Sequence, residues 1–331
     1  MHHPLTMQAI ELRAFDGTSL ALVERPLPQP QRGQVLVRVA AAPINPSDQM
    51  FIRGLYTIPR TLPTIPGFEG SGVVVDSGGG LLADALVGRR CAIGGQAGDG
   101  TWAQYIAVPA TTCVPLLPHV GLESGAMLLV NPLTAYALVD IAVQGGHRSI
   151  VQTAAAGALG RMISELARRR GLSVIEIVRR PEQVTQLRAR GAQYVLDSSA
   201  ADFDAQLRVL ADRLDARIAF DAVAGGTPGQ VLAAMPRGAR VLVYGALAEE
   251  PVTVHPGELI FQNKRVEGFW LTDWIASKPL PAVMRAALDI QTRLVDATSS
   301  KIQARFSLAE FRAALDAYAA NMSAGKVLLT P

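Results

Sequence analysis

The stretch QTAAAGALG (residues 152–160) decides how the second half of the chain is interpreted. It overlaps the end of an apolar run, SIVQTA (149–154), which is typical of a short β-strand. It also opens ALGRMISELARRR (158–170), whose apolar residues recur at helical spacing. A strand, a tight alanine- and glycine-rich turn and a helix therefore follow one another directly, which is the setting of a nucleotide-binding loop.

The turn itself fits the dinucleotide-binding pattern G-x-G-x-x-G with one substitution. Its three positions are Ala155, Gly157 and Gly160. The middle glycine would let the backbone approach a pyrophosphate, and the last would let the helix pack closely on the strand. The helix N-terminus would supply N–H donors to the phosphates. Alanine in the first position is acceptable if the turn needs no positive φ there. Taken alone, the motif could equally be an ordinary strand-to-helix turn.

The surrounding sequence favours the nucleotide loop, because strands and helices alternate from about residue 124. We expect strands at 149–154, 173–178, 194–197, 217–223, 239–247 and 265–271. Such alternation implies a parallel sheet with helices on both faces. The sequence therefore predicts an α/β, doubly wound Rossmann domain over residues 124–265.

The rest of the chain has a different texture. Runs such as QVLVRVAAAPI (34–44) and GSGVVVDSG (70–78) are rich in β-branched residues and indicate a β domain. Residues 307–321 indicate a helix that begins with a capping box, and KVLLTP (326–331) indicates a strand. We expect this tail to join the N-terminal β domain, which would give one domain from residues 1–123 and 266–331.

Composition excludes several classes of protein. The 331 residues are 49% hydrophobic and 18% charged with a net charge of +3, which argues against disorder and nucleic-acid binding. The most apolar stretch, 125–143, is interrupted by Asn131, Pro132 and Asp140, so we expect no membrane span. The two cysteines lack the close spacing of a metal site, which favours buried thiols and a cytoplasmic protein.

The end of the second predicted strand indicates which nicotinamide cofactor is bound. An NAD site has an acidic residue about 20 residues after the glycine loop, on the ribose hydroxyls. This chain has Arg179 and Arg180 there instead. Guanidinium groups bind a 2′-phosphate, which a carboxylate would repel, so we expect NADPH. A solvated surface pair of arginines is the alternative.

Two segments resemble the medium-chain dehydrogenase/reductase superfamily: APINPSDQMFIRGLY (42–56) and LPTIPGFEGSGVVV (62–75). Zinc alcohol dehydrogenases of that superfamily carry a cysteine in the first segment and Gly-His-Glu in the second. The corresponding places here carry Asn45-Pro46-Ser47-Asp48 and Gly67-Phe68-Glu69, and the five histidines of the chain are scattered. Phenylalanine cannot ligate zinc. We therefore expect a zinc-independent enzyme with no metal site.

Other segments resemble mitochondrial-type NADPH-dependent 2-enoyl thioester reductases: NPLTAY (131–136), VYGAL (243–247), LIFQNKRVEGFWLTDW (259–274) and GKVLLTP (325–331). The resemblance implies a GroES-like β-rich catalytic domain beside the Rossmann domain. It also implies the cofactor-binding residues Asn45, Asn131, Thr134, Ala156, Gly157, Ala158, Leu159, Arg179, Arg180, Tyr244, Gly245, Ala246, Leu247, Phe269, Trp270, Leu271, Thr272 and Lys326. Phe269 and Trp270 could instead fill a core or an interface between subunits.

The same resemblance implies that Tyr56, which follows Gly54-Leu55, is the catalytic tyrosine. Without a metal, hydride transfer suits a small electrophile whose developing charge can delocalise, and Tyr56 would donate a hydrogen bond to it. We expect a reductase of activated C=C bonds, with enoyl thioesters among its substrates. The loop 57–67 resembles quinone reductases as much, so an NADPH:quinone oxidoreductase is the alternative and a non-catalytic NADPH-binding protein a third hypothesis. The resemblance also implies a homodimer.

Overall fold

The computed structural model describes residues 3–56, 60–94, 98–293, 301–321 and 325–331. They form two compact units. The first contains Met1–Leu133 and Leu280–Pro331, and the second contains Thr134–Pro279. Helix α4 (Val130–Gln144) belongs to the first unit in its first turn and to the second unit from there on.

The second unit is built on a parallel sheet that has the order β10-β9-β8-β11-β12-β13 within the described residues. Its strands are β8 (Ser149–Gln152), β9 (Ser173–Val178), β10 (Tyr194–Asp197), β11 (Ile218–Asp221), β12 (Arg240–Val243) and β13 (Arg265–Gly268). The intervening helices are α5 (Ala158–Arg169), α6 (Pro181–Ala189), α7 (Phe203–Arg213), α8 (Thr227–Ala234), α9 (Pro256–Ile260) and α10 (Leu271–Ala276).

Side chains leave alternate faces of these strands, so each strand contributes to two cores. Ile175 and Ile177 of β9 pack with residues of α7 and α8, such as Leu207 and Leu232. On the opposite face, Val178 of β9 packs with residues of α6. Burial of one such aliphatic side chain is worth about 1.5–3 kcal/mol. Helices therefore cover both faces of the sheet, and the predicted doubly wound α/β domain is confirmed.

The first unit is β-rich, as predicted. Its larger sheet follows the order β14-β15-β3-β4-β5-β7, with β6 paired to β3, and its smaller sheet is the pair β1-β2. The strands are β1 (Thr6–Leu12), β2 (Leu20–Pro26), β3 (Gln34–Pro43), β4 (Glu69–Ser77), β5 (Arg90–Gly94), β6 (Tyr105–Pro109), β7 (Cys113–Pro115), β14 (Ile302–Phe306) and β15 (Lys326–Leu329). The sheet thus joins strands from the two ends of the chain.

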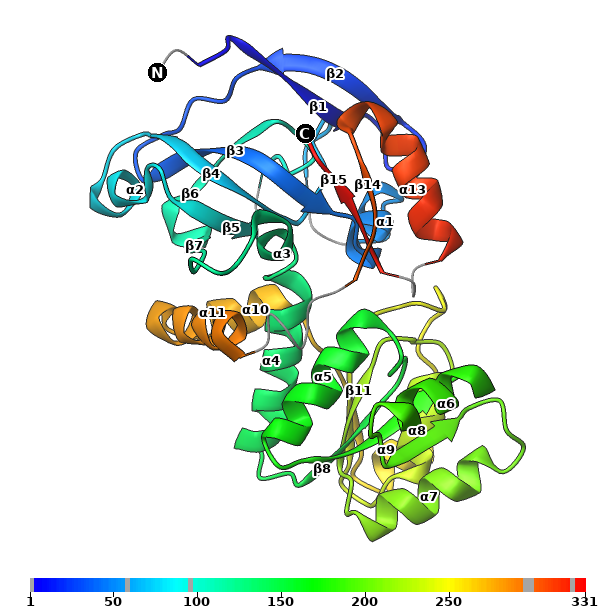
Figure 1. Ribbon diagram of the computed structural model, residues 1–331. Helices are drawn as coiled ribbons and strands as arrows, with labels where there is room; N and C mark the ends of the chain where they lie inside the picture. The colour runs from blue at the N-terminus through cyan, green and yellow to red at the C-terminus, as the bar shows by residue number, and fades with distance from the viewer. Residues whose placement is uncertain (1–2, 57–59, 95–97, 294–300, 322–324) are drawn as a thin grey trace. The chain divides into compact units, whose positions relative to one another are not determined.

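The helices of the first unit are short apart from those of the tail. They are α1 (Pro46–Ile52), α2 (Leu81–Leu86), α3 (Leu122–Ala126), α11 (Leu280–Arg293) and α13 (Phe311–Ala320). Helix α13 packs beside β14 and β15 (Figure 1). The capping box predicted at Ser307 and Glu310 is present, and it opens a single 3₁₀ turn that leads into α13.

Several predicted strands in the second unit are shorter than expected. The run 239–247 ends as a strand at Val243, and the residues beyond it form a loop in which Tyr244 N–H donates to Asp221 O at 2.8 Å and Leu247 N–H donates to Ala222 O at 3.1 Å. The run 265–271 ends at Gly268, since Trp270 is already the N-cap residue of α10. These shortened ends leave loops where the cofactor-binding residues were predicted.

Candidate cofactor and active site

A buried carboxylate anchors the N-terminus of α1 in the first unit. Asn45 is the N-cap residue, and its N–H donates to Asp48 Oδ2 at 2.8 Å in a capping box. Asp48 Oδ1 accepts the N–H of Phe68 at 3.0 Å, which ties α1 to the segment before β4. Asp48 is 0% exposed. Burial raises its pKa to about 7, against the effect of these two hydrogen bonds.

Glu69, the first residue of β4, connects three other segments. Its Oε1 accepts from Asn45 Nδ2 at 3.0 Å, and its Oε2 accepts the N–H groups of Leu129 at 3.1 Å and Val130 at 2.8 Å. An anion is favoured there, because those N–H groups open α4. Lys326 Nζ donates to Asn45 Oδ1 from β15. The Asn45 amide therefore bridges a buried ammonium and a buried carboxylate.

The carboxylate of Glu69 and the ammonium of Lys326 stabilise each other's charged forms in the interior. Burial raises the pKa of Glu69 and Lys326 opposes that shift; burial lowers the pKa of Lys326 and Glu69 opposes it. Two predicted cofactor-binding residues, Asn45 and Lys326, are thus in direct contact. Asp48 and Glu69 had been assigned no role from the sequence. The spacing of Asn45 and Asp48 is that of a capping box, which was a readable signal for Asp48.

Aromatic side chains surround the predicted catalytic tyrosine. The ring centroid of Tyr56 lies 5.1 Å from that of Phe68, which lies 5.5 Å from that of Phe51. The Arg60 guanidinium lies over Phe51 and Phe68, at 4.9 and 5.3 Å from their centroids. Phe68, in the place of the zinc-binding histidine, is therefore part of an apolar layer that also holds Tyr56. Residues 57–59 of the loop that resembles quinone reductases (57–67) lie outside the described residues.

In the second unit, the stretch QTAAAGALG (residues 152–160) contains the expected turn between β8 and α5. Gly157 is the N-cap residue of α5, so the first N–H groups of that helix lack intrahelical partners. A Cβ at Gly160 would lie 2.7 Å from Ala154 O, so glycine is required there. The positive φ of the turn falls on Ala154, at 50°, rather than on Ala155. Alanine is therefore tolerated in the first position of the motif. Ala156 is buried, whereas Ala158 and Leu159 are partly exposed.

Arg179 and Arg180 follow β9, and both are exposed. Arg180 is the N-cap residue of α6, whose first residue is Pro181. Neither guanidinium forms an ion pair with any residue that the structure describes. Both remain available to an anionic group beyond the carboxyl end of β9.

The remaining predicted cofactor residues lie on α4 and on two loops of the second unit. Asn131 is partly exposed and Thr134 is buried, one helical turn apart on α4. Tyr244, Gly245 and Ala246 are partly exposed and Leu247 is exposed, just beyond β12. Phe269 and Leu271 are half-buried, and Trp270 and Thr272 are exposed, just beyond β13. The side chains at 269–272 thus lie at a surface rather than in a core.

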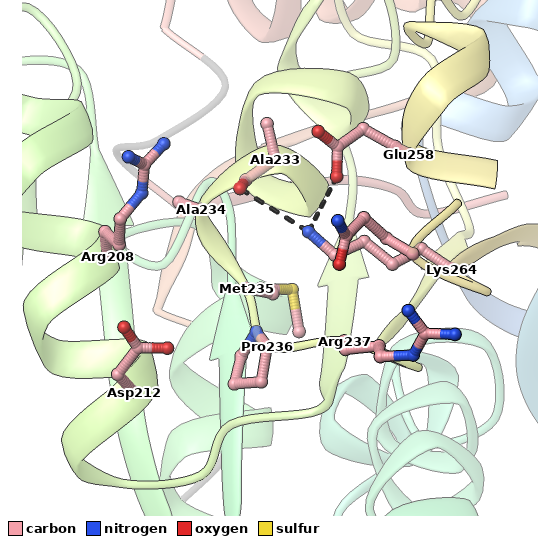
Figure 2. Close-up of a pocket in the computed structure, with 10 residues that line it drawn as sticks. Arg208, Asp212, Ala233, Ala234, Met235, Pro236, Arg237, Glu258 and Lys264 are labelled. Atoms are coloured by element: carbon pink, nitrogen blue, oxygen red, sulfur yellow. Dashed lines mark hydrogen bonds and ion pairs between the residues drawn. The ribbon is translucent and has the colours of Figure 1, made fainter. Parts of the chain in front are cut away.

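A hollow of about 280 Å³ lies elsewhere in the second unit, and none of the predicted site residues lines it (Figure 2). Lys264 Nζ at its wall donates to Glu258 Oε2 at 2.7 Å and to Leu232 O at 2.8 Å, with Ala233 O at 3.5 Å. The ammonium group is occupied by the C-terminus of α8 and by α9, so it stabilises the fold.

Two absences concern only the described part of the chain. It contains no cluster of three histidine, cysteine, aspartate or glutamate side chains able to hold a metal ion. It also contains no helix long and apolar enough to cross a membrane.

Residues 31–118 match the alcohol dehydrogenase GroES-like domain family, and residues 158–290 match the zinc-binding dehydrogenase family. The chain belongs to the medium-chain dehydrogenase/reductase superfamily of oxidoreductases, with a GroES-like domain and a Rossmann domain.

Within that superfamily the similar proteins include enoyl reductases and quinone reductases. The chain is 30% identical over 260 residues to the mitochondrial enoyl-[acyl-carrier-protein] reductase of Arabidopsis thaliana, across 77% of this chain and 69% of that one. It spans 65% of the rat and mouse proteins of the same name. A proposed NADPH:quinone reductase from Mesorhizobium loti is 38% identical over 100% of both chains, with a TM-score of 0.92. The quinone oxidoreductase of Thermus thermophilus, also solved with NADPH, is 29% identical over 98% of this chain and 100% of that one, with a TM-score of 0.78.

Proposed function

We propose that the chain is an NADPH-dependent, zinc-free reductase of activated C=C bonds, acting on α,β-unsaturated carbonyl compounds that include 2-enoyl thioesters. The observation that carries this proposal is the contact between Tyr56 and Phe68, 5.1 Å between ring centroids. An aromatic ring occupies the place of the metal ligand, and a phenol packs on it. A hydroxyl rather than a metal is then the group able to polarise the substrate oxygen.

The residues of the second unit suit NADPH. The α5 N-terminus fits a pyrophosphate, and Gly157 at its N-cap would let the backbone approach that group. Arg179 and Arg180 would hold the 2′-phosphate, since guanidinium groups bind phosphate oxygens bidentately. Asn45, Asn131, Thr134 and Lys326 would contact the nicotinamide half, together with the loops at 244–247 and 269–272. When bound, the cofactor supplies a hydride.

The reaction needs a hydride at the β-carbon and a proton at the α-carbon, which together saturate one C=C bond. Negative charge passes to the carbonyl or thioester oxygen as the hydride arrives. Tyr56 would donate a hydrogen bond to that oxygen or relay the proton to the α-carbon. The apolar layer of Phe51 and Phe68 keeps water away and strengthens that hydrogen bond.

An NADPH:quinone oxidoreductase is the second candidate, and the full-length similarity to the Mesorhizobium loti protein favours it. Tyr56 would then shape the pocket without transferring a proton. The test is a panel of crotonyl thioester, simple enones and ortho- and para-quinones, assayed with NADPH and with NADH. The first proposal predicts higher kcat/KM for thioesters and enones. A strong quinone preference would overturn it in favour of the second.

Zinc independence is tested by elemental analysis of the purified, active protein. We expect full turnover after dialysis against a chelator and less than stoichiometric zinc. Zinc at one equivalent, with activity lost on chelation and restored by zinc, would contradict the proposal.

We also propose that the chain forms a homodimer through β13. Among the described residues this strand pairs only with β12, so its other edge is available. An antiparallel partner centred on Val266 would set Arg265 opposite Glu267 of the second copy, and opposite charges across a strand pair are favourable. Ile260 and Phe261 nearby are both 69% exposed.

The dimer is tested by sedimentation of the wild type and of Val266→Pro. Proline removes a backbone donor and suits only an unpaired edge. Val266→Pro can fold only if the N–H of Val266 points away from β12, because proline would otherwise remove a hydrogen bond within the sheet. Phe261→Asp is therefore measured in parallel. A monomeric wild type would refute the proposal.

Finally, we propose a cytoplasmic location. Cys91 and Cys113 are free and buried, and burial raises their pKa values to about 11 and 12. Unpaired thiols suit a reducing compartment. Fractionation of cells that express the chain tests this, and recovery in an oxidising compartment would contradict it.

A further inference from the structure

Thr153 and Asp221 meet where the strand order of the second unit reverses. The chain runs outward through β8, β9 and β10 and then returns to β11, which pairs with β8. In open α/β sheets, ligands bind beyond the carboxyl ends of the strands at such a reversal. Thr153 directly follows β8, and Asp221 is the last residue of β11. The pair therefore lies at the floor of the expected cofactor crevice.

The two side chains form a closed set of hydrogen bonds. Thr153 Oγ1 donates to Asp221 Oδ1 at 2.7 Å and accepts the N–H of Ala222 at 3.0 Å. Asp221 Oδ2 accepts the N–H groups of Val223 at 3.1 Å and Ala224 at 2.7 Å. Thr153 is 2% exposed and Asp221 1%. A buried carboxylate with this many donors fixes the loop after β11 in one conformation.

Both loops that this pair joins contain a strained residue. Ala154, next to Thr153, has φ 50°, and Ala224, whose N–H is bound by Asp221, has φ 63°. Residues other than glycine are disfavoured in this left-handed region, and they adopt it only where the surrounding contacts enforce it. Such residues gather at ligand sites, and here both flank the same pair.

The backbone beside this pair also binds the loop that follows β12. Asp221 O accepts the N–H of Tyr244 at 2.8 Å, and Ala222 O accepts that of Leu247 at 3.1 Å. Because Thr153 precedes the turn that carries Gly157, one pair links the pyrophosphate turn to the loop at 244–247. Both segments were predicted to bind the cofactor, whereas neither Thr153 nor Asp221 was.

We propose that Thr153 and Asp221 are positioning residues that set the affinity of the chain for NADPH. They would do so by fixing the pyrophosphate turn and the loop at 244–247 in their positions relative to each other. The inference rests on the cofactor of the proposed function and is independent of the acceptor. It does not require either side chain to touch the cofactor.

The test compares Thr153→Val, which removes the hydroxyl at nearly constant shape, with Thr153→Ser, which keeps it. Ser149→Ala is the matched control, since Ser149 Oγ donates to Leu214 O at 2.7 Å from the other end of β8. NADPH binding is measured by nucleotide fluorescence, thermal stability is measured without cofactor, and kcat is measured at saturating NADPH.

We expect Thr153→Val to raise the Kd for NADPH at least tenfold, with kcat within twofold of the wild type. Thr153→Ser should stay within threefold, and Ser149→Ala should lose thermal stability without a change in Kd. Equal Kd values for Thr153→Val and Ser149→Ala would overturn the inference.

If Thr153→Val does not fold, Asp221→Asn is measured instead. The NH₂ group of the asparagine would face either the Thr153 hydroxyl or the loop N–H groups, which are already donors, so one hydrogen bond would be lost. An unchanged Kd in that variant would overturn the inference as well. A wild type that does not bind NADPH would refute the proposed cofactor itself, which separates the two failures.

Discussion

The carboxylate of Glu69 accepts the backbone N–H of Val130 at 2.8 Å, so a residue of β4 caps the helix that carries Asn131 and Thr134. The same carboxylate accepts from Asn45, whose amide oxygen is bound by Lys326. The start of α4 is thus placed by a buried charge rather than by a residue of its own helix.

Glu69→Gln should destabilise the chain by about 2–4 kcal/mol, because it leaves Lys326 buried without its counter-charge. The new amide also sets a donor against the Asn45 amide, whose orientation Lys326 fixes. The free energy of unfolding in urea measures the loss. Glu310→Gln, in the exposed capping box of the 3₁₀ turn before α13, is the control and should lose much less. Equal losses of unfolding free energy in the two variants would show that the buried charge of Glu69 stabilises the chain no more than an exposed capping residue does.

Asp48 should make the stability of the chain pH-dependent between about pH 4 and 7. Its pKa is about 7 in the folded chain and ordinarily 3.8, so the folded state binds the proton more tightly. The stabilising effect of that proton is complete below pH 3.8 and is lost as the pH rises through about 7. The pKa difference corresponds to at most about 4 kcal/mol.

The measurement compares the wild type with Asp48→Asn in urea at several pH values. Groups that do not interact with Asp48 titrate equally in both, so the difference in unfolding free energy reports on Asp48 together with Glu69 and Lys326, the carboxylate and the ammonium that act on its charge. The wild type should lose stability relative to the variant as pH rises. Parallel curves would contradict the raised pKa.

Tyr56→Phe should lower kcat on enones and enoyl thioesters by about 10²-fold, the usual effect of losing a general acid. Packing on Phe68 is kept, so the Kd for NADPH should not change. Tyr105→Phe, in β6 of the same unit, is the control. Full turnover of Tyr56→Phe on every acceptor would refute the catalytic role.

Replacing Arg179 and Arg180 together with glutamine should raise the KM for NADPH by about 10²-fold, since each charge-assisted hydrogen bond is worth about 1.5–3 kcal/mol. The KM for NADH, which lacks the 2′-phosphate, should be unchanged. Arg188→Gln on α6 controls for loss of charge. Equal effects on both cofactors would favour the alternative of a solvated surface pair.

Local patterns were sufficient to predict that the six strands of the parallel sheet exist, although not the helices α8, α9 and α10. The strand 173–178 was predicted with its observed bounds, because buried parallel strands are continuous apolar runs. The ends of 217–223 and 239–247 were missed, since they depend on hydrogen bonds between loops that only the folded sheet brings together.

In the candidate site, too, the long-range contacts could not be predicted from local sequence patterns. Asn45 and Lys326 are 281 residues apart, and only resemblance to a family linked them to one function. Thr153 and Asp221, 68 residues apart, carry no local signal beyond following a strand. Contacts of this kind depend on which strands become neighbours, and neither spacing nor periodicity records that.

The position of β15 in the larger sheet has a consequence for the order in which the chain can form. This strand lies between β14 and β3 and carries the ammonium that reaches Asn45. During synthesis Asn45, Asp48 and Glu69 leave the ribosome before the parallel sheet of residues 149–268, and all of them are made before Lys326. A chain interrupted after residue 320 would therefore contain every strand of the Rossmann sheet, whereas its first unit would bury Glu69 without the ammonium of Lys326.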